Sequence, residues 1–327
     1  MRRREFIKLA GGAGLGWTVA APAQPADAMP TIGLLTPAKL PDWALKAIRS
    51  GLDEAGFAEG RNLTILVRSA ESQFDRLPAL AADLVKSEVR VILATGSPVP
   101  ARTAKAATTA IPIVFAYGGD PIADGLVESL NQPGGNVTGA TFIGSALLAK
   151  RMEILREIVP QATEIALLVN PKGTLAERQV KDGMAAAQTL GQRLDVLNTS
   201  TLDEIDAAFA TMRELKVGAF IVSTDPFFGF VGRDRLVMQA RSYGIPGMYN
   251  ARQETGAGGL ISYGPNLSDT WRQAGLYVGR ILKGENPSAL PVMQPTKFEM
   301  VINLKTAREL GLTIPPSMLG LADEVIE

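Results

Sequence analysis

The chain has 327 residues, of which 46% are hydrophobic and 20% are charged, enough apolar material for the cores of two domains. Lysine plus arginine and aspartate plus glutamate balance at 33 each, so no overall charge would attract nucleic acid or an anionic membrane. Histidine and cysteine are both absent, which excludes Ser-His-Asp and Cys-His nucleophiles, the usual zinc ligand sets and disulfides. We expect no metal, no cofactor and no nucleic-acid partner.

Residues 1–28 have the three parts of an export signal: a basic start, an apolar middle and small residues at a cleavable end. Arg3 and Arg4, followed by Glu-Phe-Ile-Lys, resemble the twin-arginine export consensus. Cleavage is expected after Ala23, with Ala28 as the alternative. A membrane-anchoring helix is the competing interpretation, but the apolar stretch is short and rich in glycine for a bilayer span. The segment therefore predicts export to a bacterial periplasm and removal of the leader.

From residue 31 onward, short apolar runs alternate with segments of helical periodicity, which is typical of mainly parallel sheets covered by helices. In the first half, strands are expected in TIGLLTP (31–37), NLTILVRSA (62–70), VRVILATG (89–96), IPIVFAYGGD (111–120) and NVTGATFI (136–143), with helices over 42–57 and 76–88. In the second half, strands are expected in EIALLVNP (164–171), DVLNTS (195–200), AFIVSTDP (219–226) and IPGMYN (245–250), with helices over 146–160 and 177–191. Further on come a strand in GLISYG (259–264), a helix over 271–287, and a strand followed by a helix over 296–312.

This alternation predicts an α/β protein made of two Rossmann-like, doubly wound lobes joined by a hinge that the chain crosses several times. The strand in GLISYG is expected to run back toward the first half. Lobe 1 is therefore predicted as 31–141 plus 251–291, and lobe 2 as 142–250 plus 292–327. The cleft between them is the expected binding place.

Seven stretches follow one another in the order found in a known family. They are FAEGRN (57–62), DRLPALAADLV (75–85), TTAIPIVFAYGGDPIADGLV (108–127), NQPGGNVTG (131–139), GAGGLISYGPNLSDTWRQAG (256–275), QPTKFEMVINLKTARELGLTIPPS (294–317) and ADEVIE (322–327). Together they resemble the ABC-transporter substrate-binding proteins whose best-known members bind tryptophan or tyrosine. The resemblance implies the type I periplasmic-binding fold, two lobes that close on a small organic solute, and chain crossings near residues 140, 250 and 291. It also implies delivery of the solute to an inner-membrane ABC permease with a cytoplasmic ATPase.

Thr95, Gly96 and Ser97 lie where an apolar strand ends and a helix begins at Pro98. Hydroxyls and free backbone N–H groups at such a place can hold a carboxylate. Ser97 is therefore predicted to bind a carboxylate or another polar group of the ligand, while a helix N-cap is the competing and compatible interpretation. A nucleophilic Ser97 would need a lysine base, and none stands at a recognisable spacing.

The remaining candidates also cluster at strand ends. In the first half they are Thr36, Pro37, Trp43, Tyr117, Gly118 and Asp120. Trp43 would cover the cleft or pack at the surface. Tyr117 would stack on the ligand or donate its hydroxyl, and Gly118 would allow the backbone to approach closely. For Asp120, an N-cap role before Pro121 is favoured over ligand contact.

In the second half the candidates are Asn170, Asp225, Pro226 and Phe227. Asp225 would pair with an amine and Phe227 would enclose an apolar group; capping and core packing are the alternatives. Thr141, Tyr249 and Tyr263 fall near the expected hinge crossings, where ligand contact and hinge packing are both open.

These patterns predict a monomeric, exported solute-binding protein that captures an amino acid or an organic acid by lobe closure and performs no covalent chemistry. A receptor module that passes a ligand-bound shape to a membrane signalling protein fits the same sequence. An exported enzyme would need an acid/base pair that is not visible. A cytosolic regulator would need a DNA-binding headpiece, and the leader occupies its place.

Overall fold

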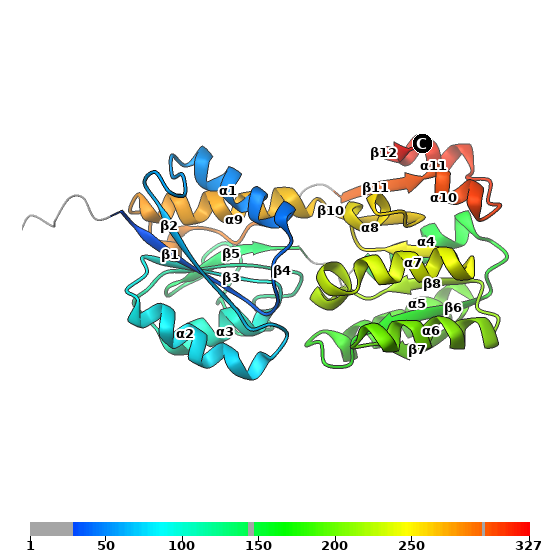
Figure 1. Ribbon diagram of the computed structural model, residues 1–327, viewed down its shortest axis with the longest axis horizontal. Coiled ribbons are helices and arrows are strands. Elements are labelled where there is room, and N and C mark those ends of the chain that lie inside the picture. The colour runs from blue at the N-terminus through cyan, green and yellow to red at the C-terminus, as the bar shows by residue number, and fades with distance from the viewer. Residues whose placement is uncertain (1–28, 143–146, 296–297) are drawn as a thin grey trace, which may run out of the picture.

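The computed structural model describes residues 29–142, 147–295 and 298–327, and these form two α/β lobes side by side (Figure 1). One lobe holds a five-stranded sheet and the other a seven-stranded sheet. The predicted two-lobed α/β architecture is confirmed. The expected export signal over 1–28 lies outside the described residues, and no helix within them is long and apolar enough to cross a membrane.

The sheet of lobe 1 has the order β2-β1-β3-β4-β5, and all neighbouring strands are parallel. Its strands are β1 (Thr31–Thr36), β2 (Thr64–Ser69), β3 (Val91–Thr95), β4 (Ile113–Tyr117) and β5 (Val137–Thr141). Its helices are α1 (Asp42–Glu54), α2 (Leu77–Lys86), α3 (Pro98–Ala107) and, from far along the chain, α9 (Leu267–Leu282), with short 3₁₀ turns η1 (Phe74–Arg76) and η4 (Pro287–Ala289).

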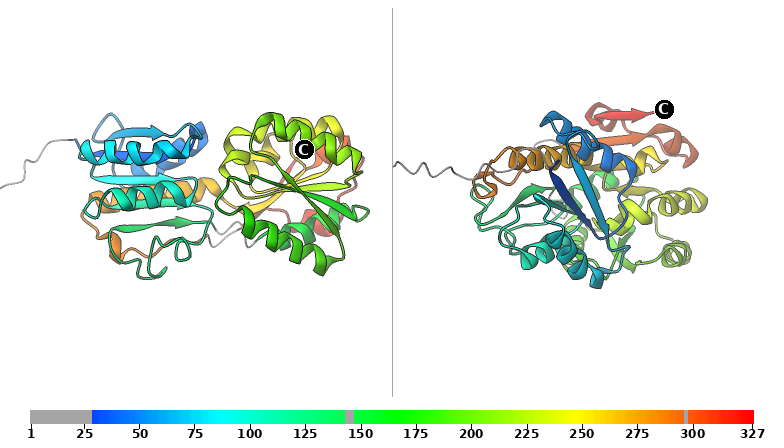
Figure 2. Two further views of the ribbon diagram at one scale, coloured as in Figure 1. Left: turned by 90° about the horizontal axis from the view of Figure 1, so that it is seen from below. Right: turned by 60° about the vertical axis from the view of Figure 1, so that its left-hand side comes forward.

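Both faces of this sheet are buried, because helices cover each of them (Figures 1 and 2). Alternation along β3 explains how: Val91 and Leu93 enter the core beneath α1 and α9, whereas Ile92 and Ala94 enter the core beneath α2 and α3. A strand buried on both faces reads as a continuous apolar run, as VILA does in the sequence.

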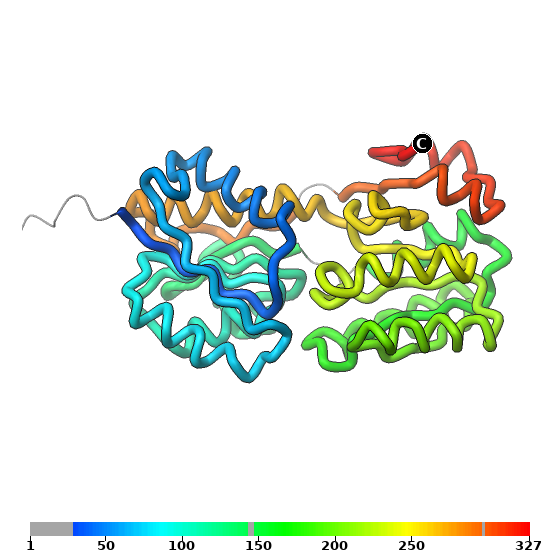
Figure 3. Tube along the Cα trace, viewed as in Figure 1, coloured from blue at the N-terminus to red at the C-terminus, as the bar shows by residue number. Residues whose placement is uncertain are grey.

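Helix α9 is held in lobe 1 by very close packing on α1. A Cβ on Gly51 would lie 1.8 Å from the backbone oxygen of Arg272, and a Cβ on Gly275 would lie 2.2 Å from the backbone oxygen of Ile48. Glycine at these two positions therefore allows the helix backbones to touch. The tube in Figure 3 shows the orange α9 returning from lobe 2 to lie beside the blue α1.

The sheet of lobe 2 has the order β12-β11-β10-β9-β8-β6-β7, and only the β10–β11 pair is antiparallel. Its strands are β6 (Glu164–Val169), β7 (Arg193–Asn198), β8 (Ala219–Val222), β9 (Gly247–Tyr249), β10 (Ile261–Pro265), β11 (Phe298–Asn303) and β12 (Glu324–Ile326). Its helices are α4 (Leu148–Ile158), α5 (Ala176–Leu190), α6 (Leu202–Glu214), α7 (Arg233–Tyr243), α8 (Arg252–Gly256), α10 (Leu304–Glu309) and α11 (Pro316–Leu321), with a π-helical turn η3 (Phe227–Val231). Helices α4 and α5 cover one face of the sheet, and α6 and α7 cover the other.

The described residues change lobe three times along the chain: Phe142 belongs to lobe 1 and Leu147 to lobe 2, Asn266 joins β10 of lobe 2 to α9 of lobe 1, and β11, which begins at Phe298, lies again in lobe 2. The predicted crossing near residue 250 is wrong, because β10 pairs with β9 and β11 in the sheet of lobe 2. Residues 251–265 therefore belong to lobe 2 and not to lobe 1. The predicted boundary at 291 is also early, since the backbone of Met293 still exchanges hydrogen bonds with Gly139 and Thr141 of lobe 1.

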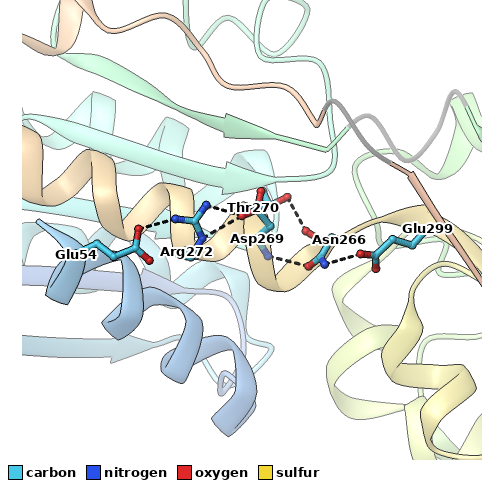
Figure 4. A network of polar contacts seen from close by, with 6 residues as sticks. All are labelled: Glu54, Asn266, Asp269, Thr270, Arg272 and Glu299. Atoms are coloured by element: carbon cyan, nitrogen blue, oxygen red, sulfur yellow. Dashed lines mark hydrogen bonds and ion pairs between the residues drawn. The ribbon is translucent and has the colours of Figure 1, made fainter. Parts of the chain in front are cut away.

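A polar network follows α9 across this hinge (Figure 4). Asn266 caps α9 by accepting a hydrogen bond from the backbone N–H of Asp269 at 2.8 Å, and its Nδ2 donates to Oε1 of Glu299 on β11 at 2.6 Å. Arg272 bonds both Asp269 and Glu54 of α1, each at 2.6 Å. The second and third connections are thus joined to each other and to lobe 1.

Candidate functional site

A cavity of about 850 Å³, part of it open to solvent, lies between the carboxyl ends of the two sheets. Residues that follow β3, β4 and β5 line it from lobe 1, and residues that follow β6, β8 and β9 line it from lobe 2. This is the edge at which open parallel sheets bind ligands.

Six of the sixteen predicted site residues meet at this cavity. They are Gly96, Ser97, Tyr117, Gly118, Asp225 and Pro226. The two lobes nearly touch there: a Cβ on Gly118 would lie 3.2 Å from Cγ2 of Thr224 in the other lobe. The predicted role of Gly118 in allowing close approach fits this spacing.

Ser97 occupies the N-cap position of α3, is only 8% exposed and lines the cavity. Its side chain makes no capping hydrogen bond, and its Oγ has no partner among the described residues. The capping alternative therefore does not account for the hydroxyl. Gly96 before it has φ +88°, a backbone conformation that favours glycine and turns the chain sharply from β3 into α3.

Tyr117 is among the residues that line the cavity, but it is fully buried, and its ring packs edge-on against Phe115 at 5.4 Å. Its hydroxyl is also engaged, because it donates to Oδ2 of Asp124 at 2.6 Å. Burial, and then this hydrogen bond, raise the pKa of Tyr117 far above its usual value. Of the two roles predicted for Tyr117, stacking on a ligand would need a ring face that core packing now covers. Donation of the hydroxyl to a ligand is not compatible with its hydrogen bond to Asp124.

Asp225 lies three residues after the end of β8, at the lobe 2 side of the cavity. Its Oδ1 accepts hydrogen bonds from Nδ2 of Asn170 and from the backbone N–H of Phe227, both at 2.9 Å. Its Oδ2 lies over Gly173, where a Cβ would come within 2.3 Å. Burial raises the pKa of Asp225, while the two hydrogen bonds oppose that shift. Asn170 does not line the cavity itself and acts by holding this carboxylate.

Gln179 of α5 fixes the segment that carries Asp225. Its side-chain amide donates to the backbone oxygen of Thr224 at 3.0 Å and accepts from the backbone N–H of Thr224 at 2.5 Å. The chain then turns through the π-helical segment η3, a form that often marks functional sites. The position of the Asp225 carboxylate is therefore set by neighbours on two other elements.

The sequence analysis missed two charged residues that line the cavity, Arg151 of α4 and Glu254 of α8. Arg151 is 1% exposed, and its Nε donates to the backbone oxygen of Tyr263 at 2.7 Å. Burial lowers the pKa of Arg151 to about 10, so it remains protonated at neutral pH. A signal for it existed: Arg151 occupies the buried face of α4 beside Leu148 and Leu155, where an apolar residue is expected.

Glu254 is 4% exposed, and burial raises its pKa to about 7. The α8 helix that carries it has five residues, too short for a periodicity that would have marked it. Three phenylalanines, Phe74, Phe142 and Phe230, also line the cavity and were not predicted.

The other candidates from lobe 1 lie outside the cavity lining. Thr36 donates to the backbone oxygen of Ala38 at 2.7 Å, and Pro37 packs over Gly96. Thr95 is buried in the sheet. Asp120 accepts from the backbone N–H of Ile122 at 3.0 Å and so caps a turn, but no helix follows, so the helix N-cap favoured for it is not formed.

Trp43, Thr141 and Phe227 also serve the structure around the site. The Trp43 ring meets Trp271 edge-on at 6.3 Å and is absent from the cavity lining, so of the two roles predicted for it the structure favours packing. Thr141 donates its hydroxyl to the backbone oxygen of Gly119. Phe227 packs on Phe228 at 5.2 Å, at the margin of a lobe 2 core.

Tyr249 and Tyr263 were expected near hinge crossings, but both belong to lobe 2. The Tyr249 ring is buried against Phe220 at 5.6 Å, and the Tyr263 ring packs beside Phe298 at 6.2 Å. Neither side chain lines the cavity. Within the described part of the chain, acidic side chains form no group of three or more that could hold a metal ion.

Comparison with known proteins gives consistent results. The family model of the ABC transporter substrate-binding proteins matches residues 40–326. A tyrosine-binding protein of Clostridioides difficile is 26% identical over 272 residues, which cover 83% of this chain and 77% of the relative. A structure from Streptococcus pneumoniae in complex with L-Trp is 27% identical, with a TM-score of 0.80, covering 91% of this chain and all of that one. A conserved domain protein from Vibrio cholerae is 25% identical, with a TM-score of 0.81 and the same coverage. These matches confirm the resemblance and the type I periplasmic-binding fold.

Proposed function

Because the chain belongs to the ABC transporter substrate-binding protein family, we propose that it is the exported, periplasmic solute-binding component of an ABC importer. Its ligand is an amino acid or a related organic acid with an apolar, aromatic-sized side chain. The protein acts as a monomer, hands the solute to an inner-membrane permease coupled to a cytoplasmic ATPase, and performs no covalent chemistry.

The observation that carries this proposal is a cavity lined by both lobes. A ligand that contacts both lobes binds the closed form better than the open form, and this difference in affinity is what drives closure. The lobes also meet directly, since the Phe230 ring of lobe 2 packs on Trp271 of α9 at 6.1 Å. Closure therefore adds an aromatic contact to those made by the ligand.

The walls of the cavity favour a ligand with a sizeable apolar part. Four aromatic residues line it, together with three prolines and two leucines. The aromatic residues are Phe74, Tyr117, Phe142 and Phe230. Ligand sites with mostly apolar walls use a small number of polar groups to orient the occupant. The names of two relatives, one a tyrosine-binding protein and the other a complex with L-Trp, agree with this preference.

Ser97 supplies the group for a carboxylate. Its hydroxyl is buried, without a partner among the described residues, and located at the N-terminus of a ten-residue helix, where the helix dipole favours an anion. Pro98 and Pro100 have no backbone N–H, so Val99 is the sole amide donor among the first three helical residues. The side-chain hydroxyl is correspondingly more important here than at an ordinary helix N-terminus.

Asp225 supplies the group for an ammonium. Its Oδ1 is occupied by Asn170 and Phe227, which leaves Oδ2 beside the cavity-lining Gly173. The Asp225 carboxylate on one side of the cavity matches the ammonium group of an α-amino acid, and the Ser97 hydroxyl with the Val99 amide on the other side matches its carboxylate.

Calorimetry of the purified protein with amino acids and their desamino analogues tests the proposal. L-Phenylalanine and 3-phenylpropionate are a matched pair that differ in the ammonium group. Asp225→Asn should weaken L-phenylalanine binding by about 10-fold or more, and should weaken 3-phenylpropionate binding much less, because a hydrogen bond to a charged group is lost only in the first case. Asp120→Asn, outside the cavity lining, is the control. If no amino acid or organic acid binds, the proposal is wrong.

A further inference from the structure

Glu254 is a buried acid in the cavity lining that the proposed contacts with Ser97 and Asp225 do not use. Its Oε2 is shielded from solvent and accepts no hydrogen bond from any described residue. A buried carboxylate oxygen without a donor is costly, and in native structures such an atom needs an explanation. The cavity that Glu254 lines is where a donor could approach it.

The charged and titratable groups around Glu254 come from three other elements. The guanidinium groups of Arg151 on α4 and Arg233 on α7 favour its ionised form, and the phenol of Tyr249 on β9 also feels its charge. The backbone N–H groups of Glu254 and Ala251 act in the same direction as the arginines. Burial outweighs these effects and raises the pKa of Glu254, so a donor from the ligand would stabilise the carboxylate and displace its proton.

Glu254 and Asp225 belong to neighbouring parts of the lobe 2 wall of the cavity, which we call the cavity floor. Asp225 follows β8, whereas Glu254 lies on α8, which follows the adjacent parallel strand β9. Arg151 reaches both places, because its two terminal nitrogens lie 3.4 Å from Oγ1 of Thr224 and 3.5 Å from the backbone oxygen of Asn250. A ligand with its ammonium at Asp225 can therefore extend its side chain along the floor toward Glu254.

We propose that Glu254 accepts a hydrogen bond from an N–H or O–H group on the side chain of the ligand. Glu254 is thus a specificity-determining residue: the preferred ligands are amino acids whose largely apolar side chain carries a donor. This inference rests on the proposed function, since it assumes an amino acid in the cavity. A site that hydrogen-bonds a ligand hydroxyl discriminates strongly against the analogue that lacks it, because the buried acceptor is then left unpaired.

Two matched ligand pairs test the inference on the unaltered protein by calorimetry. L-Tyrosine carries a hydroxyl that L-phenylalanine lacks, and L-tryptophan carries an indole N–H that 1-methyl-L-tryptophan lacks. We expect the member with the donor to bind about 10- to 100-fold more tightly in at least one pair. Binding of that member should also release protons, which is measured by repeating the titration at pH 7 in buffers of different ionisation enthalpy.

Substitutions then assign the effect to Glu254. Glu254→Met removes the acceptor and should reduce the preference within the pair to about 1, with no loss of affinity for the member without a donor. Glu254→Gln keeps a neutral acceptor oxygen, so it should retain part of the preference but abolish proton release. Glu285→Gln, an exposed glutamate paired with Arg280, is the control and should leave both quantities unchanged.

A purely structural Glu254 would give a different result. Its substitution would lower stability or weaken all ligands alike, with the preference and the proton release unaltered, and this outcome would overturn the inference. Equal binding within both pairs would also overturn it, while leaving the proposed function intact. If none of the four compounds binds, the inference is wrong, and binding of other amino or organic acids then decides whether the proposed function stands.

Discussion

Replacing Ser97 with alanine separates ligand binding from helix capping. The hydroxyl is 8% exposed, lines the cavity and makes no capping hydrogen bond. A hydrogen bond to a charged ligand group contributes about 1.5–3 kcal/mol, so Ser97→Ala should weaken the binding of a carboxylate ligand by about 10- to 150-fold. The free energy of unfolding without ligand should stay within about 0.5 kcal/mol or rise, because the substitution removes a buried hydroxyl that has no partner.

Thr201 offers the matched control for this substitution. It caps α6, where its Oγ1 accepts from the backbone N–H of Glu204 at 3.2 Å, and it does not line the cavity. Thr201→Ala should therefore lower stability by about 0.5–2 kcal/mol and leave affinity unchanged. The two variants are expected to show opposite patterns.

Thermal melts of the free protein and calorimetry with the best ligand measure both quantities. Each kcal/mol of stability corresponds to a shift of about 2–4 °C in Tm for domains of this size. The reasoning is refuted if Ser97→Ala keeps its affinity and melts lower by an amount typical of a lost cap. Ser97 would then be a structural residue at the start of α3.

Three further predictions concern pH, closure and packing. Burial raises the pKa of Glu254 from 4.5 to about 7, so its contribution to stability is fully present below pH 4.5 and is lost as pH rises through about 7. In urea unfolding, the free energy of unfolding of Glu254→Gln should therefore increase by about 3 kcal/mol relative to that of the wild type between pH 5 and pH 8. Parallel curves of stability against pH for the two proteins would contradict this. Phe230→Ala removes the 6.1 Å contact between the Phe230 and Trp271 rings, so it should raise the Kd of the ligand about 2- to 12-fold. It should also reduce the change in tryptophan fluorescence that the ligand induces. An unchanged fluorescence signal would exclude a role of this contact in closure. Gly275→Ala would place a Cβ 2.2 Å from a backbone carbonyl oxygen of α1, so it should lower the free energy of unfolding by about 1–3 kcal/mol in thermal melts. Gly320→Ala, with open space around it, is the control and should be neutral. Equal Tm values for the two variants would show that α9 can shift freely.

The sequence by itself determined most of the strands and helices and the edge of each sheet where the cavity lies. The apolar run Val91–Thr95 and the helical periodicity of α1 are local patterns, and they place strands and helices without knowledge of the rest of the chain. Ser97 and Asp225 could each be predicted because each follows a strand, and ligands bind at the carboxyl edge of an open parallel sheet.

Only the tertiary structure decided the direction of each side chain and the lobe to which some segments belong. Tyr249 ends β9 and Tyr263 lies within β10, and packing places their rings against Phe220 and Phe298 of lobe 2, outside the cavity lining. The helix-and-strand pattern of residues 251–265 is compatible with either lobe, and only the pairing of β10 with β9 and β11 assigns this segment to lobe 2.

Arg151 stands out in the sequence only as a charged residue on the apolar face of α4, and Glu254 lies on a helix of five residues that is too short to show periodicity. They meet in the cavity because α4 and α8 both pack against the lobe 2 sheet near its carboxyl edge. Local propensity acts over a few residues, whereas the environment of a buried charge is set by contacts between residues far apart in the sequence. That is why the strands were predictable and the charged floor of the cavity was not.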